Sequence, residues 1–235
     1  MKFLRVILGL LLIPVCVALT RSVLSLVVIL GSTPDLRQSW PALVLGAGVL
    51  LWTVLFSVLP KPVRSYVLAH ELTHAFWAAV TGADVSGLKV SKSGGSVKVS
   101  EVNWLTALAP YFFPFYTVLV VLLYGLLALF LNMRGWEWVW LGLIGLTLGF
   151  HWTFTLDSLA QPQSYIQRYG RLFSYPLIYL FNLMVVGLVL VLAGPVTFSQ
   201  FGERLLRDLD WIWRLGYQAV EMTLQWGRLR LAGFT

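Results

Sequence analysis

Long apolar segments separated by short polar loops make up most of this chain of 235 residues. Most of them reach the roughly 20 residues that a helix needs to cross the hydrocarbon core of a bilayer. Only 11% of the residues are charged, against roughly 25% in a typical soluble domain. The six segments cover approximately 3–30, 40–59, 65–80, 105–131, 136–159 and 173–196. We therefore predict an all-α polytopic membrane protein with about six transmembrane helices.

The first apolar segment is too long for one straight span. Pro14 and Arg21 interrupt it, so the sequence leaves open whether residues 1–30 form one span or a span followed by an interfacial helix. Lys2 and Arg5 before the apolar run resemble the start of a signal peptide, but no convincing cleavage site follows. We therefore expect an uncleaved anchor.

The third apolar segment contains the motif H-E-x-x-H, formed by His70, Glu71 and His74. Residues four positions apart lie on one face of a helix, so the two histidines can hold one zinc ion. Glu71 can then act as the general base that deprotonates the attacking water. The alternative is a pair of histidines that pack between helices. We favour the metal site because ionisable side chains within an apolar segment are costly and usually functional.

A catalytic zinc usually takes three protein ligands, and the fifth apolar segment offers two candidates for the third, His151 and Asp157. Six residues apart on a helix, they point in directions roughly 120° apart, so we expect only one to reach the metal. If the third and fifth segments run in the same direction, their depth in the membrane favours His151. If the hairpin or the broken start of the fourth segment shifts this count, Asp157 is favoured instead. Either residue can instead form a hydrogen bond between helices. In the sixth segment, Asn182 is a candidate for substrate binding.

Apolar and polar residues alternate over positions 85–100, on both sides of Gly94 and Gly95. This pattern predicts a short β-hairpin directly after the H-E-x-x-H helix. An extended substrate could pair with its open edge as an added strand. A solvated loop is the alternative interpretation of the same residues.

Prolines and glycines predict where the later segments bend and where they pack closely. Pro110 and Pro114 exclude a regular helix at the start of the fourth segment, and irregular backbone at that depth usually lines a cavity. Gly142, Gly145 and Gly149 allow another helix to approach the fifth segment closely.

The tail at 200–235 mixes tryptophan and leucine with arginine and aspartate. It predicts an amphipathic helix on the membrane surface, with a second short helix near 219–231. A helix that binds a partner protein is the alternative. We therefore divide the chain into an integral-membrane metallopeptidase domain at 1–199 and an amphipathic tail at 200–235.

Basic residues do not give a consistent orientation in a six-span count. Lys2 and Arg5 place the N-terminus in the cytoplasm, and the count then places Lys61 and Arg134 there too. Arg168 falls on the opposite side, which the positive-inside rule disfavours. The membrane orientation is therefore open.

The formal net charge of +7 would suit nucleic-acid binding in a soluble protein. Here basic residues at the ends of spans report topology and contact with lipid, so we expect no nucleic-acid partner. Cys16 is the single cysteine of the sequence and allows no internal disulfide.

The H-E-L-T-H run at 70–74, followed by a glycine-rich hairpin, resembles the site-2 protease family of intramembrane zinc metallopeptidases. The chain is most similar to the short, compact branch of that family. The L-D-S run at 156–158 partly resembles the family's later L-D-G, whose aspartate is the third zinc ligand. Ser158 replaces the glycine and the usual N-P-x-P run is absent, so both Asp157 and His151 stay open as ligands.

The resemblance implies a Zn²⁺-dependent endopeptidase that cleaves peptide bonds of membrane-embedded or membrane-proximal substrates. It also implies a multi-pass protein of the bacterial cytoplasmic membrane, with a peptide substrate and the lipid bilayer as partners. Two other functions remain as alternatives: a catalytically inactive zinc-binding scaffold and a metal-ion transporter. The oligomeric state and the substrate are not predicted.

Overall fold

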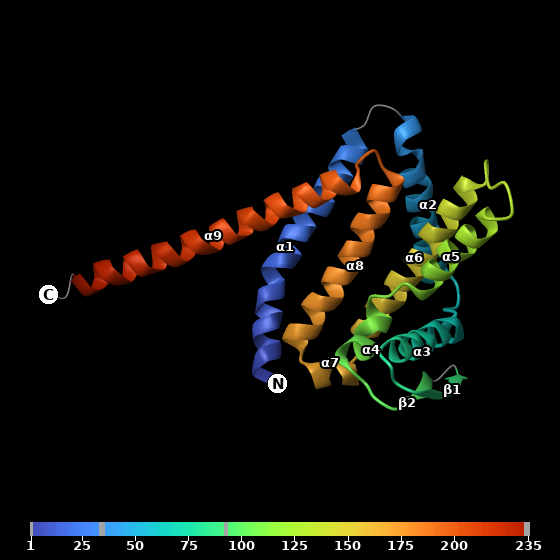
Figure 1. Ribbon diagram of the computed structural model, residues 1–235, viewed down its shortest axis with the longest axis horizontal. Coiled ribbons are helices and arrows are strands. Elements are labelled where there is room, and N and C mark those ends of the chain that lie inside the picture. The colour runs from blue at the N-terminus through green and yellow to red at the C-terminus, as the bar shows by residue number, and fades with distance from the viewer. Residues whose placement is uncertain (1, 33–35, 92–93, 233–235) are drawn as a thin grey trace.

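The computed structural model describes residues 2–32, 36–91 and 94–232, and it is mainly helical (Figure 1). In chain order the elements are α1 (Lys2–Ser32), α2 (Leu36–Val58), α3 (Val63–Val80), β1 (Val85–Ser91), β2 (Gly94–Val99), α4 (Trp104–Leu108), the 3₁₀ turn η1 (Ala109–Tyr111), α5 (Phe115–Ala128), α6 (Glu137–Leu159), α7 (Ser164–Tyr169), α8 (Arg171–Ala193) and α9 (Phe198–Ala232). The predicted helical class and the predicted hairpin are both confirmed.

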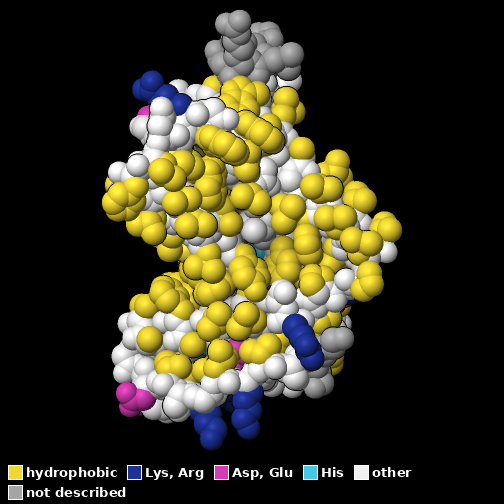
Figure 2. Space-filling model, turned by 90° about the vertical axis from the view of Figure 1, so that its right-hand side faces the viewer, with side chains coloured by type: hydrophobic (Ala, Val, Ile, Leu, Met, Phe, Trp, Pro, Cys, Tyr) yellow, Lys and Arg dark blue, Asp and Glu magenta, His cyan; other side chains and the backbone are white. Residues whose placement is uncertain are grey.

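Four helices in the described ranges are long and apolar enough to cross a membrane: α1, residues Ser39–Val58 of α2, α6 and α8. Large apolar side chains on these helices face outward, as Leu50 and Leu192 do with 65% and 73% of their surface exposed. Figure 2 shows a broad band of such side chains between the two ends of the molecule. These features suggest a membrane protein, because lipid is the solvent that such a surface requires.

The count of about six spans is not confirmed. A fifth span is present only if α4, η1 and α5 count as one, and they are bent by 84°. Pro110 and Pro114 lie at this bend, as expected, because proline cannot donate the backbone hydrogen bond that a continuous helix needs. α3 is not among the four candidate spans. It lies across the lower end of the molecule, beside the hairpin (Figure 1).

The first apolar segment forms one continuous helix, α1, despite Pro14. α1 packs along α8, and α2 packs along α6. Gly145 allows the second contact: a Cβ atom there would overlap the carbonyl oxygen of Leu45. The predicted close approach of a helix to this glycine is therefore confirmed.

α1 and α8 both begin at the lower end, where the Nη1 atom of Arg5 donates to the Arg168 carbonyl oxygen at 3.2 Å. The loop with Arg134, between α5 and α6, lies at the other end (Figure 1). The six-span count, which separated Arg168 from Arg5, is therefore wrong on this point. Its error was to treat the segment of α3 as a crossing, which reversed the direction of every later segment.

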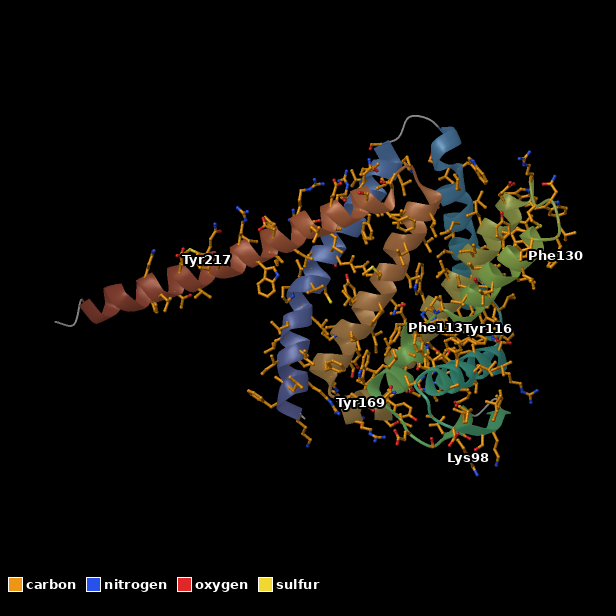
Figure 3. All side chains as sticks on the ribbon, in the orientation of Figure 1. Lys98, Phe113, Tyr116, Phe130, Tyr169 and Tyr217 are labelled. Carbon is orange, nitrogen blue, oxygen red and sulfur yellow. The ribbon has the colours of Figure 1, made fainter. Side chains whose placement is uncertain are left out.

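The tail forms one amphipathic helix, α9, so the second short helix expected near 219–231 is wrong. Near its start α9 crosses α1, where Asp208 accepts hydrogen bonds from Arg21 and Ser22 at 3.2 and 2.7 Å. Beyond this crossing α9 leaves the bundle (Figure 1), and Tyr217 in that part is 65% exposed (Figure 3).

Candidate metal centre

α3 brings the two histidines of the H-E-x-x-H motif side by side. The helix begins at Val63, directly after Pro62, and the motif occupies its middle turns. The ring centres of His70 and His74 are 4.8 Å apart and their planes are inclined by 81°. The predicted pairing of the two rings on one helix face is confirmed.

His74 is held in a defined orientation by α4. Its Nδ1 atom lies 2.7 Å from the carbonyl oxygen of Thr106, and the side chain is only 6% exposed. Because a carbonyl oxygen can only accept, Nδ1 carries the proton, and in the neutral ring Nε2 keeps its lone pair. Histidine ligands of metals are usually oriented by a hydrogen bond of this kind from the other ring nitrogen.

His70 makes its polar contact through the same ring nitrogen. The hydroxyl of Tyr66, one turn earlier on α3, lies 3.3 Å from Nδ1 of His70. The ring of Tyr111 from η1 covers His70, with 5.6 Å between the ring centres. No hydrogen bond within the described residues involves Nε2 of His70 or of His74.

Glu71 lies beneath the hairpin and is 8% exposed. A Cβ atom at Gly95 of β2 would lie 2.6 Å from Cγ of Glu71 and from a methyl group of Val67. The glycine therefore allows β2 to rest directly on the glutamate. His70, Glu71 and His74 line one cavity together with residues of β2.

Other walls of this cavity come from the irregular segment at Pro110, which the sequence analysis expected to line a cavity, and from residues 163–165, which it did not single out. Tyr111 is 1% exposed, and its hydroxyl donates to Oε1 of Gln163 at 2.9 Å. Tyr165 of α7 packs on His74, with ring centres 5.3 Å apart. The irregular backbone at Pro110 was the available signal for Tyr111, but nothing in the sequence connects 163–165 with the motif.

His151 lies on α6 and is separated from this cavity. It lines a second, smaller cavity on the other side of His70, together with Tyr66 and Tyr116. Figure 3 shows Tyr116 and Phe113 near α3. The structure therefore brings His151 near His70, but it does not bring it into the cavity that holds all three motif residues.

Asn182 bonds to His151 rather than facing the motif cavity. Its amide nitrogen donates to the carbonyl oxygens of Tyr111 and Ile178, each at 2.9 Å. Its Oδ1 atom lies 3.2 Å from Nε2 of His151, and this oxygen can only accept. Nε2 of His151 therefore carries a proton. In this arrangement Asn182 joins α8, α6 and η1. Neither Asn182 nor His151 lines the motif cavity, where substrate binding and zinc binding were expected.

Asp157 lies at the end of α6 and forms an ion pair with Lys61, with 2.8 Å between Nζ and Oδ1. The two side chains are 40% and 42% exposed. Asp157 does not line the motif cavity. The structure therefore places both third-ligand candidates, Asp157 and His151, in other interactions.

The donor set fits a zinc ion in part. Two imidazoles with free Nε2 atoms and a neighbouring carboxylate suit zinc chemistry. Among the described residues, however, no group of three His, Cys, Asp or Glu side chains is arranged to hold a metal. The hydroxyl of Thr106, which lines the same cavity, is buried and has no hydrogen-bond partner within the described residues.

Comparison with known proteins adds no relative to this geometry. The chain matches no protein-family model, no curated protein and no solved structure. The resemblance to site-2 proteases therefore depends on the motif, its hairpin and the partial L-D-S match at 156–158.

Proposed function

We propose that this protein is a zinc-dependent intramembrane endopeptidase that hydrolyses a peptide bond of a membrane-embedded or membrane-proximal substrate. The single observation that carries the proposal is the cavity shared by His70, Glu71, His74 and strand β2. A catalytically inactive scaffold would need the two imidazoles but would have no chemical use for a buried glutamate beside them.

His70 and His74 would hold the zinc through their Nε2 atoms. The hydrogen bond from His74 to Thr106 supports this role, because it leaves the correct nitrogen free and limits rotation of the ring. When bound, zinc would act as a Lewis acid toward the scissile carbonyl and the attacking water. The third ligand is not assembled among the described residues, and variants of His151 and Asp157 test which of the two supplies it.

Glu71 would move the proton. Its carboxylate would take a proton from the attacking water as the new C–O bond forms. It would then give that proton to the amine as the C–N bond breaks. The products are a carboxylate and an amine, and the water supplies all the added atoms. Packing of Gly95 against Glu71 would hold the carboxylate in place during both transfers.

Strand β2 would hold the substrate extended. The described hairpin has two strands, so each has one edge without a strand partner. Gly95, Ser96 and Val97 of β2 line the motif cavity. A peptide paired with this edge would pass over Glu71, and a helical substrate would have to unwind to do so.

The test is cleavage of a single-span model substrate by the full chain reconstituted in vesicles. The Glu71→Gln variant should retain zinc and lose cleavage by about 10²- to 10⁴-fold, the usual contribution of a general base. The matched control is Glu101→Gln, because Glu101 is exposed and lies outside the cavity. This control should cleave at the wild-type rate.

Three outcomes would contradict the proposal. Unchanged cleavage by Glu71→Gln would show that Glu71 is not the general base. Bound zinc without cleavage in the wild type would favour the inactive scaffold. Metal flux into vesicles that is lost in His74→Ala, without proteolysis, would favour the transporter.

A further inference from the structure

A further cavity, with a strongly basic rim, lies at the lower end of the molecule, between α1 and α8. Lys2, Arg5 and Arg168 line it, with Tyr169, Leu172 and Phe173. It shares no lining residue with the motif cavity. It therefore needs an explanation that does not involve the proposed protease chemistry.

Two arginines of this rim lie over one aromatic ring. The guanidinium carbon of Arg5 is 4.7 Å from the ring centre of Tyr169, and that of Arg168 is 5.9 Å away. The ring is oriented by its hydroxyl, which donates to the carbonyl oxygen of Val102 at 3.0 Å (Figure 3). The two like charges are thus held close together by contacts that do not neutralise either of them.

No carboxylate balances these charges in the parts of the chain that the structure describes. None of Lys2, Arg5 and Arg168 forms an ion pair there. Glu101 is next to Val102 in sequence, yet it is not paired with either arginine. A bound anion would relieve the repulsion between the two guanidinium groups.

The hydrogen-bond donors and positive charges of the rim suit a phosphate group. Arginine binds phosphate through two parallel N–H groups, and the N-terminus of α8 begins at Arg171 beside the cavity. Exposed apolar side chains lie at and beside this cavity: Leu172 lines it and is 39% exposed, and Phe3, next to Lys2 on α1, is 78% exposed. Free phosphate would have no use for this apolar neighbour, whereas a phospholipid places acyl chains there.

We propose that this cavity binds the headgroup phosphate of an anionic phospholipid, with Arg5 and Arg168 on the phosphate, Lys2 at the rim and the acyl chains against Leu172 and Phe3. Basic pockets between transmembrane helices are known to bind lipid headgroups in this way. The lipid would join α1 to the start of α8. The proposal is independent of the proposed peptidase function and would hold if no substrate is ever cleaved.

The test is native mass spectrometry of the full chain in detergent, with phosphatidylglycerol and phosphatidylcholine of equal acyl length added in turn. Wild type should retain phosphatidylglycerol in preference to phosphatidylcholine. The preference should fall about fivefold for each basic residue removed, and therefore about 25-fold in Arg5→Gln with Arg168→Gln. Lys2→Gln changes an exposed side chain and should reduce the preference without any effect on folding.

Arg134→Gln is the matched control, because Arg134 is an exposed arginine at the opposite end of the molecule. It should keep the wild-type preference. The proposal is overturned if wild type retains both lipids equally, or if Lys2→Gln and the double variant keep the full preference. It is also overturned if inorganic phosphate alone displaces phosphatidylglycerol at equal concentration, because the ligand would then be a free anion.

Discussion

His74 of α3 and His151 of α6 are both buried and hydrogen-bonded, yet their ring nitrogens are used in opposite ways. In the motif cavity, His74 donates through Nδ1 to a carbonyl oxygen and leaves Nε2 free. On α6, His151 donates through Nε2 to the amide oxygen of Asn182. A histidine in an apolar segment is therefore not a metal ligand by residue type alone. Its second hydrogen bond determines which nitrogen remains available.

The neighbours of the two regions explain this difference. α3 lies across the end of the bundle, where the broken helix α4–η1 presents a backbone carbonyl to His74. α6 runs along the bundle and meets the side chain of Asn182 on α8. Irregular backbone thus supplies the acceptor in the first region, and a polar side chain supplies it in the second.

The largest expected effect is on zinc affinity. Loss of a second-shell partner usually costs 10- to 100-fold in metal affinity, so loss of the ligand His74 in His74→Ala should cost more than about 100-fold. His151→Ala should keep wild-type affinity, because His151 lies outside the motif cavity and lines the smaller cavity instead. Competition with a chelator measures both. Equal loss of zinc from the two variants would show that His151 is the third ligand and that His74 and His151 do not differ in role.

The second effect is on the packing of the hairpin over Glu71. Gly95→Val places carbon atoms where Cγ of Glu71 and a Val67 methyl group already lie, and such overpacking costs about 1–3 kcal/mol. We expect a lower midpoint of thermal unfolding in detergent and slower cleavage of the model substrate. Gly125→Ala is the control, because a Cβ atom there meets no other atom within 4 Å. Wild-type cleavage by Gly95→Val would show that β2 does not position the glutamate.

The third effect concerns the pair formed by His151 and Asn182. Each single alanine variant leaves a buried polar group without its partner, which should lower the free energy of unfolding by about 1–3 kcal/mol. The double variant should cost less than the sum of the two, because both remove the same hydrogen bond. Urea unfolding in detergent measures all three proteins. Strict additivity would mean that the pair is not coupled and that Asn182 has another role.

The smallest effect is expected at Asp157. Its ion pair with Lys61 is about 40% exposed on both sides, and exposed pairs contribute less than about 1 kcal/mol. Asp157→Asn and Lys61→Gln should therefore have nearly the same small effect on thermal stability, and both should retain zinc. If only Asp157→Asn releases zinc, Asp157 leaves Lys61 when the metal binds and is the third ligand.

The local elements were largely predictable from sequence. The alternation around Gly94 and Gly95 predicted the hairpin, and the prolines of the fourth segment predicted its break. The spacing of His70 and His74 predicted adjacent rings. Each of these features depends on residues that are near one another in the chain, where backbone geometry alone sets the outcome.

The prediction failed where a segment had to be placed relative to the others. The segment of α3 is apolar enough to be mistaken for a span, but it lies across the end of the bundle. That error reversed the later segments and separated Arg168 from Arg5. Apolar composition reports that a segment avoids water, and it does not distinguish burial in lipid from burial against protein.

The amino-acid sequence thus determines the two adjacent imidazoles, the neighbouring carboxylate and the hairpin that follows them. Short-range periodicity is enough to specify these features. The partners of each polar group come from the folded chain alone: Thr106 for His74, Asn182 for His151 and Lys61 for Asp157. These partners are 32, 31 and 96 positions apart in the chain. Contacts over such separations depend on how whole helices pack, and no local pattern encodes them.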